Sequence, residues 1–245
     1  MHLYGQYCPV ARATEILGDR WTVLIVRELL ADIGHFNELE RGLPGISRSL
    51  LAERLERLVR TGVLERREAS AAGRGRAFNY RLTAAGQALQ PIIDAMGAWG
   101  ARFALGEPQP HELDPIVLLW WMRRRVAFDR IARELLVIGF EFRDARPPRS
   151  WLVVKPPKEA SVCLKHPGFD VDVVVRGDIA AFYRVWLGRE TLAAVLRRGE
   201  VRLEGAPADL RGFPGWFTWS PMAGVVRTAH LQSRSSTGHR PSALH

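Results

Sequence analysis

Polar side chains able to donate and accept hydrogen bonds gather near the start of one amphipathic segment of the sequence. Arg48 and Ser49 are adjacent, and Glu53 follows one helical turn later. Arginine and serine can donate to base edges in a DNA major groove, and glutamate can accept from the amino group of cytosine. The alternative is an ordinary amphipathic helix whose polar face only meets solvent. These residue types predict base recognition by Arg48, Ser49 and Glu53.

Arginines in the same region could neutralise phosphates. Residues 41–81 contain ten arginines and four glutamates, a local net charge of +6 in a chain whose net charge is +9. A basic patch favours a polyanion, most often a nucleic acid, although charge alone would also suit an acidic lipid or simple solubility. We assign contacts with phosphate or the minor groove to Arg57, Arg74 and Arg76, and we expect Arg54 to be a further DNA-binding residue.

One thiol stands near a predicted helix start. Cys8 precedes the first helix, where the positive end of the helix dipole and nearby Arg12 would favour the thiolate and make it reactive. The alternative is that Cys8 is a small buried apolar residue. Cys163 lies in a predicted strand, and we expect it to be inert.

The sequence contains no motif for catalysis, a cofactor or a metal. It lacks the H-E-x-x-H, G-x-S-x-G and dinucleotide-binding patterns, and the two cysteines lack metal-ligand spacing with the seven histidines. We therefore expect no catalytic residue, no cofactor and no metal site. The N-terminus has no signal-like segment, and the longest apolar run, residues 116–122, is too short for a bilayer. These features predict a cytoplasmic protein that does not associate with membranes.

The polar residues near position 48 need a helix to present them, and the surrounding pattern predicts one. Ser47 is a natural N-cap, Leu51, Leu55 and Leu58 recur on one helical face, and Gly62 can end the helix. Further helices are predicted before it, and two strands with a basic connecting loop are predicted after it. Their ranges are 10–17, 20–30 with Asp19 as cap, 36–41, 63–67 and 77–82. This order predicts a helix-turn-helix followed by a wing that contacts DNA.

A longer helix is predicted over residues 84–103, capped by Thr83. Its apolar residues are Leu89, Ile92, Ile93, Met96 and Trp99. They offer more apolar surface than one small domain needs, which favours packing between two copies of the chain. The alternative is a long helix within the core.

The N-terminal region closely resembles the HxlR-type winged-helix transcriptional regulators of bacteria over roughly residues 5–105. The matching segments are 8–10 (CPV), 16–22 (ILGDRWT), 27–29 (REL), 36–39 (FNEL), 43–47 (LPGIS), 54–55 (RL), 62–64 (GVL), 80–83 (YRLT) and Gly86. The resemblance implies a homodimer on a pseudo-palindromic operator, with Ser47, Arg48 and Ser49 at the major groove. It also implies that Cys8 senses oxidants or electrophiles.

The C-terminal region is predicted to mix helices and strands. Helices are expected at 115–136, 178–187, 189–198 and 208–219, and strands at 150–155, 160–164, 171–176 and 200–205. The order around 175–178 (VRGD) and 202–205 (RLEG) resembles a sterol-carrier-protein-like domain over about residues 110–222. That resemblance implies helices packed on a mixed sheet that can enclose an apolar tunnel. Five aromatic residues could either line or fill such a tunnel: Phe182, Trp186, Phe213, Trp216 and Phe217.

These observations predict an α+β chain of two domains. We expect a winged-helix domain at 1–105, a linker at 106–114, a sterol-carrier-like domain at 115–226 and a disordered tail at 227–245. The expected function is DNA-binding transcriptional regulation, most simply repression, with a C-terminal domain that binds a small apolar ligand or supports assembly. One rival is a lipid-binding or carrier protein whose winged helix only dimerises. The other is an enzyme, which the missing catalytic motifs disfavour.

Overall fold

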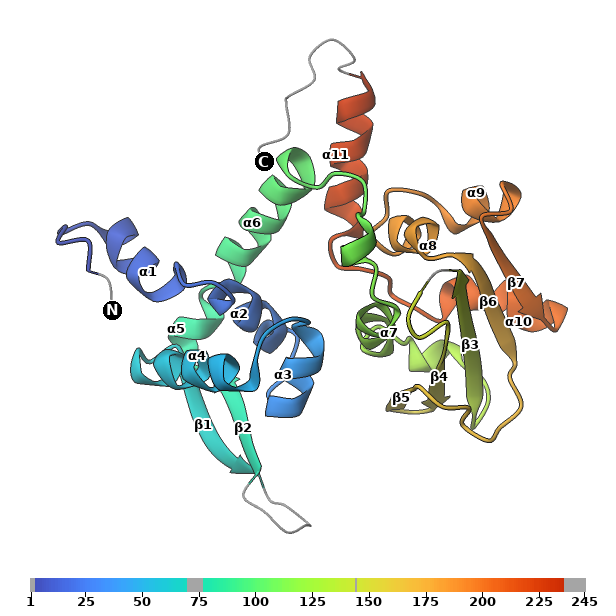
Figure 1. Ribbon diagram of the computed structural model, residues 1–245, viewed down its shortest axis with the longest axis horizontal. Helices are drawn as coiled ribbons and strands as arrows, with labels where there is room; N and C mark the ends of the chain where they lie inside the picture. The colour runs from blue at the N-terminus through green and yellow to red at the C-terminus, as the bar shows by residue number, and fades with distance from the viewer. Residues whose placement is uncertain (1–2, 70–76, 144, 236–245) are drawn as a thin grey trace. The chain divides into compact units, whose positions relative to one another are not determined.

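The computed structural model describes residues 3–69, 77–143 and 145–235 (Figure 1). The chain divides into two compact units, Met1–Met96 and Gly97–His245. This division falls inside helix α6 (Gln90–Phe103), seven residues after its first residue. No helix in the described part of the chain has the length and apolar character needed to cross a membrane.

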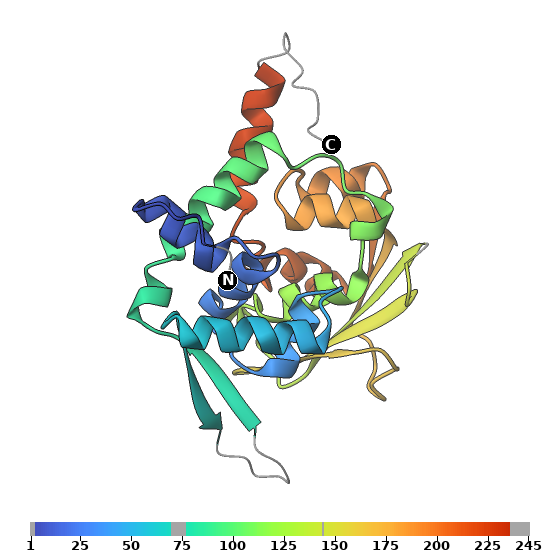
Figure 2. The same ribbon diagram turned by 60° about the vertical axis from the view of Figure 1, so that its left-hand side comes forward.

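The first unit contains the predicted helices and strands in the predicted order. The helices are α1 (Pro9–Leu17), α2 (Thr22–Leu30), α3 (Phe36–Gly42) and α4 (Arg48–Arg60), and the strands are β1 (Leu64–Ala69) and β2 (Ala77–Leu82). Leu51, Leu55 and Leu58 of α4 are buried, as their spacing predicts. The antiparallel β1–β2 hairpin extends away from α4 in both views (Figures 1 and 2). A helix-turn-helix followed by a wing is therefore confirmed.

The turn between α3 and α4 depends on one glycine. Gly45 has a φ of +89°, a conformation that residues with a Cβ rarely adopt. Leu43 and Ile46 on either side of it are buried in the core of the unit. The turn is thus fixed at both ends, and it sets the direction in which α4 starts.

The long helix expected at residues 84–103 is two helices. α5 (Ala84–Gln87), capped by the Thr83 hydroxyl, ends before α6 begins. Pro91 is the second residue of α6, where its missing backbone N–H leaves no helical hydrogen bond unmade. Within one continuous helix over residues 84–103, the same proline would remove a hydrogen bond and clash with the preceding turn. None of the residues of α6 is buried, so the alternative of a core helix is wrong.

The second unit is built on a five-stranded mixed sheet. Its strands are β3 (Leu136–Arg143), β4 (Arg149–Lys155), β5 (Glu159–Cys163), β6 (Val173–Asp178) and β7 (Val201–Gly205), in the order β5-β4-β3-β6-β7. β3 and β6 are parallel, and every other pair is antiparallel. The helices are α7 (Pro115–Arg123), α8 (Ile179–Trp186), α9 (Leu192–Arg197), α10 (Pro207–Gly212) and α11 (Ala223–Ser235). The expected α+β fold with helices on a mixed sheet is confirmed.

The central strand β3 was not predicted from the sequence. The helix expected at 115–136 ends at Arg123, so that prediction is wrong beyond this residue. Leu136 to Phe140 are all buried, because β3 has a neighbouring strand on each edge and is covered on both faces. Such a strand reads as a continuous apolar run without the alternation that identifies half-buried strands. In register, Ile138 lies opposite Leu152 of β4 and Val173 of β6.

Two further expectations near the C-terminus are corrected. The helix expected at 208–219 stops at Gly212, and a short 3-10 turn, Phe213–Gly215, follows it at Pro214. The tail expected to be unstructured from residue 227 is helical as far as Ser235, because α11 is anchored by the buried Ala223 and Val226. Residues 236–245 lie outside the described part of the chain.

Candidate nucleic-acid interface

The N-terminus of α4 is exposed and rich in hydrogen-bonding groups. Ser47 caps the helix, its hydroxyl accepting from the backbone N–H of Leu50 at 3.2 Å, and it lies 3.2 Å from the hydroxyl of Ser49. Ser47, Arg48 and Ser49 are all exposed. A helix start that combines free donors with a positive dipole end suits a surface of phosphates and base edges.

Arg48 is held in place by α3. Its guanidinium forms an ion pair with Glu40, donates to Asn37 Oδ1 at 3.3 Å, and lies 4.9 Å from the ring centroid of Phe36. The Arg48 side chain is nevertheless 63% exposed. Sequence reasoning missed these partners, although Asn37 and Glu40 lie three residues apart on α3 and could share one helical face. Arg48 is thus oriented beforehand and remains open to a ligand.

Glu53 and Arg54 form a pair on the next turn of α4. Arg54 donates to Glu53 at 2.6 Å, lies 3.7 Å from the carboxylate of Asp19, and also points a donor at the carbonyl of Arg20 at 3.4 Å. Glu53 is exposed, whereas the Arg54 side chain is only 15% exposed. Glu53 can therefore still accept from a base, while Arg54 mainly braces α4 against the residues before α2.

The assignment of Arg57 to a phosphate contact disagrees with the structure. Its guanidinium donates to the carboxylate of Asp19 and to the carbonyl of Glu15, and the side chain is 19% exposed. Asp19, expected to cap α2, instead accepts from Arg57, and Trp21 occupies the N-cap position with a φ of 79°. Arg57 thus ties α4 to the junction of α1 and α2. A single-sequence pattern gives no sign of a contact between residues so far apart.

The two strands of the wing form a regular antiparallel hairpin. β1 and β2 pair from Leu64↔Leu82 to Ala69↔Ala77, the last pair before the connecting segment. Arg74 and Arg76 belong to that segment and lie outside the described residues. On the strands, the guanidinium of Arg66 lies 4.4 Å from the ring centroid of Phe78.

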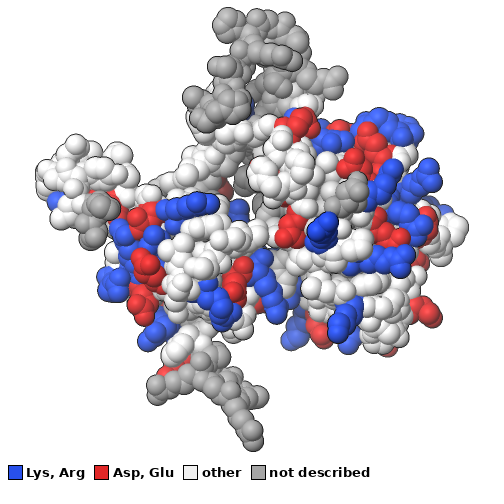
Figure 3. All heavy atoms as spheres, viewed as in Figure 1, with Lys and Arg blue, Asp and Glu red and all other residues white. Residues whose placement is uncertain are grey.

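Charges on the first unit alternate in sign. In the face shown in Figure 3, arginines of this unit lie next to acidic side chains, in agreement with the ion pairs of Arg48, Arg54 and Arg57. Arg48, Arg54 and Arg57, three of the ten arginines between residues 41 and 81, are therefore paired with carboxylates. A DNA contact on this unit has to select exposed arginines such as Arg48.

Cys8 takes the N-cap position of α1. It is partly exposed, its thiol is free, and its carbonyl accepts from the backbone N–H of Arg12 at 3.0 Å. The guanidinium of Arg12 turns away and donates to Glu15 at 3.0 Å. A hydrogen bond from the Tyr4 backbone N–H, helped by Arg12, holds the pKa of Glu15 below its ordinary value. The positive charge of Arg12 is therefore paired with the Glu15 carboxylate.

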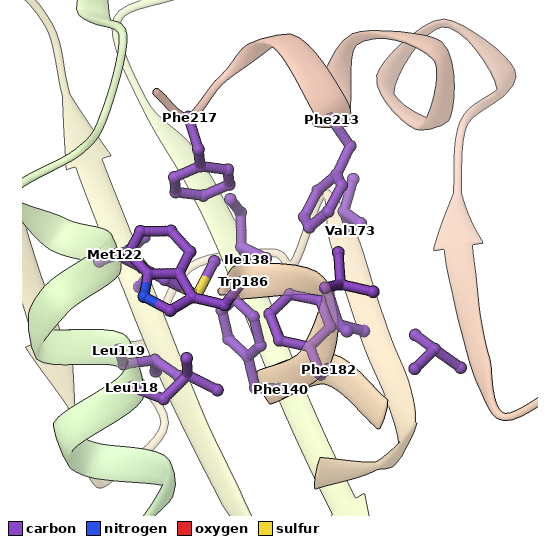
Figure 4. Packing of buried hydrophobic residues seen from close by; sticks show 14 of the residues in the cluster. Leu118, Leu119, Met122, Ile138, Phe140, Val173, Phe182, Trp186, Phe213 and Phe217 are labelled. Carbon is purple, nitrogen blue, oxygen red and sulfur yellow. The ribbon is translucent and has the colours of Figure 1, made fainter. Parts of the chain in front are cut away.

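The five aromatic residues proposed for a ligand tunnel fill the core of the second unit. Phe182, Trp186, Phe213, Trp216 and Phe217 are all buried. Figure 4 shows four of them among Leu118, Leu119 and Met122 of α7 and Ile138 and Phe140 of β3. The rings touch one another, with centroids 5.7 Å apart for Phe213 and Phe217 and 6.0 Å apart for Phe213 and Trp216. Of the two alternatives, burial of all five side chains agrees with filling of the core and not with lining of an open tunnel.

Comparisons with known proteins place the first unit in a family. A family model described as the HxlR-like helix-turn-helix matches residues 16–107. An uncharacterized HTH-type transcriptional regulator of Mycobacterium tuberculosis, Rv3095, is 39% identical over 44% of this chain, and the chain covers 65% of its length. The regulator YvaP of Bacillus subtilis is 35% identical over 40% of this chain and 91% of its own length.

The similarity extends to a solved structure. The quinone-bound form of YodB from B. subtilis is 35% identical to this chain, with 39% of this chain and 99% of that one covered and a TM-score of 0.34. Each of these proteins matches between 39% and 44% of this chain, and the family model covers the residues that form the helix-turn-helix and the wing. The chain belongs to the HxlR-like helix-turn-helix family, in which the relatives named here are transcriptional regulators.

Proposed function

We propose that this protein is a sequence-specific DNA-binding transcriptional regulator that acts as a repressor by occupying an operator. The observation that carries the proposal is the start of α4, where Arg48 is exposed and oriented by Glu40 and Asn37. Arg48, Ser49 and Glu53 would read base edges in the major groove, and Ser47 would position the helix. Arg74 and Arg76, on the wing, would hold phosphates or enter the minor groove.

The test is fluorescence anisotropy of the full chain against DNA from upstream of its own gene. A scrambled duplex of equal length is the control, and each titration is repeated over a range of salt concentrations. We expect tighter binding to the upstream DNA and a steep loss of affinity as salt rises, because phosphate contacts release counterions. Equal and weak binding to both duplexes would favour the rival carrier protein, in which the winged helix only dimerises.

We further propose that the regulator is a homodimer joined through α6. Four large apolar side chains of α6 follow one another at intervals of four, three and four residues, a spacing that places them in one stripe. They are Ile92, Met96, Trp99 and Phe103, exposed by 44%, 51%, 57% and 55%. Two copies of this stripe could pack together and place two α4 helices on the halves of a pseudo-palindromic operator.

Replacing Trp99 by glutamate is expected to convert the dimer to a monomer, because it places a charge in the centre of the apolar stripe. Light scattering coupled to size exclusion measures the mass directly. Leu164→Glu is the matched control, since Leu164 is 56% exposed but follows β5 and is not part of α6. A Trp99→Glu protein that stays dimeric would exclude α6 as the interface.

Cys8 is proposed as a sensor of electrophiles. A quinone reacts with a thiolate by addition, which would place an uncharged bulky group at the N-terminus of α1. YodB supports this proposal, because it is 35% identical to this chain over 97 residues and has been described in a quinone-bound form. The partial exposure of the free Cys8 thiol is compatible with access of a small electrophile.

Treatment with 2-methyl-1,4-benzoquinone is expected to add one quinone at Cys8 and to weaken operator binding. Mass spectrometry of the digested protein locates the adduct, and anisotropy measures the affinity. Cys163→Ser should respond as the native chain does, and Cys8→Ser should keep its affinity. An adduct confined to Cys163, or full operator binding by the Cys8 adduct, would refute the sensor.

The C-terminal unit is proposed to be a sterol-carrier-like domain that binds a small ligand or supports assembly. The five-stranded mixed sheet and its helices support this reading. Its aromatic core is filled, so a ligand needs another place in this unit.

A further inference from the structure

A cavity of about 480 Å³ lies in the second unit beside α8. Its volume is within the range of small-molecule sites. All of its lining residues belong to the second unit, and none of them is one of the five core aromatics. The cavity wall includes the segment that follows α6, which passes α8 in the view of Figure 2.

Most of the cavity wall is apolar. Leu105 and Pro108 come from the segment after α6, Trp121 from α7, and Leu187 from the end of α8. The ring of Tyr183 packs edge-on against Trp121, with centroids 6.2 Å apart. The Tyr183 hydroxyl donates to the carbonyl of Asp114 at 2.8 Å, and burial raises the pKa of Tyr183. Tyr183 therefore presents a neutral ring to the cavity, which suits an uncharged ligand body.

The polar end of the cavity is a largely buried guanidinium with an exposed partner. Arg189 is 14% exposed, and it donates to the carbonyl of Gly106 at 2.5 Å and to Glu107 Oε1 at 2.9 Å. The Glu107 side chain is 65% exposed, so its attraction to Arg189 is weakened by solvent. The other arginine of the wall, Arg184, binds Glu190 at 2.9 Å and Glu200 at 3.4 Å and is committed to them.

We propose that this cavity binds a monocarboxylate with an apolar body, and that the ligand carboxylate takes the place of Glu107 on Arg189. A guanidinium recognises a carboxylate through two parallel hydrogen bonds, which are stronger where water is excluded. The ligand carboxylate would reach Arg189 from the cavity side, while its apolar body replaces water against Leu105, Trp121 and Leu187. Glu107 occupies the anion position until the ligand arrives.

Displacement of Glu107 would release the segment after α6 from Arg189. Gly106 and Glu107 follow Phe103, the last residue of α6, by only a few residues. A ligand that binds better when this segment is released would shift the conformation of the chain next to the proposed dimer helix. This consequence for DNA rests on the proposed function, whereas binding in the cavity does not.

The test is isothermal titration of the full chain with octanoate, and with 1-octanol as the uncharged probe of equal chain length. We expect saturable binding of octanoate and much weaker binding of octanol. Arg189→Gln should weaken octanoate binding about tenfold or more, as expected for loss of a charge-assisted pair. Glu107→Gln should tighten it several-fold, because the competing carboxylate is gone. Glu134→Gln is the matched control, since it removes an exposed carboxylate of the same unit without lining the cavity.

The Glu107→Gln variant keeps the proposal falsifiable if Arg189→Gln does not fold, because a gain in affinity does not arise from misfolding. Unchanged octanoate affinity in Glu107→Gln, or equal binding of octanol and octanoate, would overturn the proposal. Operator anisotropy with and without octanoate is the second arm. Octanoate binding to a chain that does not recognise its operator would remove the proposed function and leave the cavity site standing. Operator binding without any octanoate binding would overturn the cavity proposal and leave the proposed function standing.

Discussion

Replacing Phe182 by alanine is expected to lower the free energy of unfolding of the C-terminal unit by about 3–5 kcal/mol, the usual cost of removing a fully buried phenylalanine. Phe182 is 0% exposed, and its ring centroid lies 6.0 Å from that of Phe140 and 5.7 Å from that of Phe142. The loss combines the lost burial with a cavity that the sheet cannot close, because its neighbours are held by paired strands. If Phe182 instead lined an open tunnel, its replacement would lower the free energy of unfolding far less.

Differential scanning calorimetry of the full chain measures this effect, with the two units treated as separate transitions. The transition of the second unit should move to lower temperature while that of the first stays in place. Phe169→Ala is the matched control, since Phe169 is 42% exposed in the same unit. Equal shifts for the two variants would show that Phe182 does not fill the core.

Replacing Arg48 by alanine is expected to weaken operator binding by about 1–3 kcal/mol and to relax the sequence preference at the bases it contacts. The reason is the loss of a donor pair that Glu40 and Asn37 hold in position. Anisotropy with single-base operator variants measures both the affinity and the preference. An equal loss on every sequence would mean that Arg48 touches only phosphate.

Arg60→Ala is the matched control for Arg48. Arg60 lies at the other end of α4, is 68% exposed, and loses the same charge on substitution. We expect it to lower affinity little and equally on all duplexes. Glu40→Gln removes a negative charge and also the ion pair that orients Arg48. Loss of the negative charge should raise the affinity for unrelated DNA. Loss of the orientation should lower the discrimination between sequences. Unchanged discrimination in Glu40→Gln would deny Glu40 a positioning role.

The helices of the first unit could be predicted because their cores repeat at helical spacing. Leu51, Leu55 and Leu58 mark the buried face of α4, and Ser47 and Gly62 mark its ends, all through interactions local in sequence. The same reasoning failed for β3, where burial on both faces removes the alternation that marks a strand. The same reasoning predicted disorder from residue 227, whereas α11 continues to Ser235. This helix is anchored by two buried residues, Ala223 and Val226, and has no continuous apolar stripe that the sequence would show.

The candidate site was predictable in its residue types and less so in their roles. Arg48, Arg54 and Arg57 look alike in the sequence, yet the first is exposed and the other two are largely buried in ion pairs. The difference comes from Asp19 and the Glu15 carbonyl, which are brought to α4 only by the tertiary fold. Likewise, an aromatic-rich sequence does not say whether its rings surround a space or occupy it, because that depends on how closely the sheet and helices approach.

An inserted residue would have very different effects within helix α6 and in the segment that follows it. A residue inserted between Met96 and Trp99 would turn everything after it by about 100° around the helix axis, because each residue of an α-helix adds that rotation. Ile92 and Met96 would then face away from Trp99 and Phe103, although no side chain had been replaced. By contrast, a residue inserted between Phe103 and Gly106 would leave the stripe intact. Across relatives, gaps in an alignment would therefore be expected after this helix and not within it.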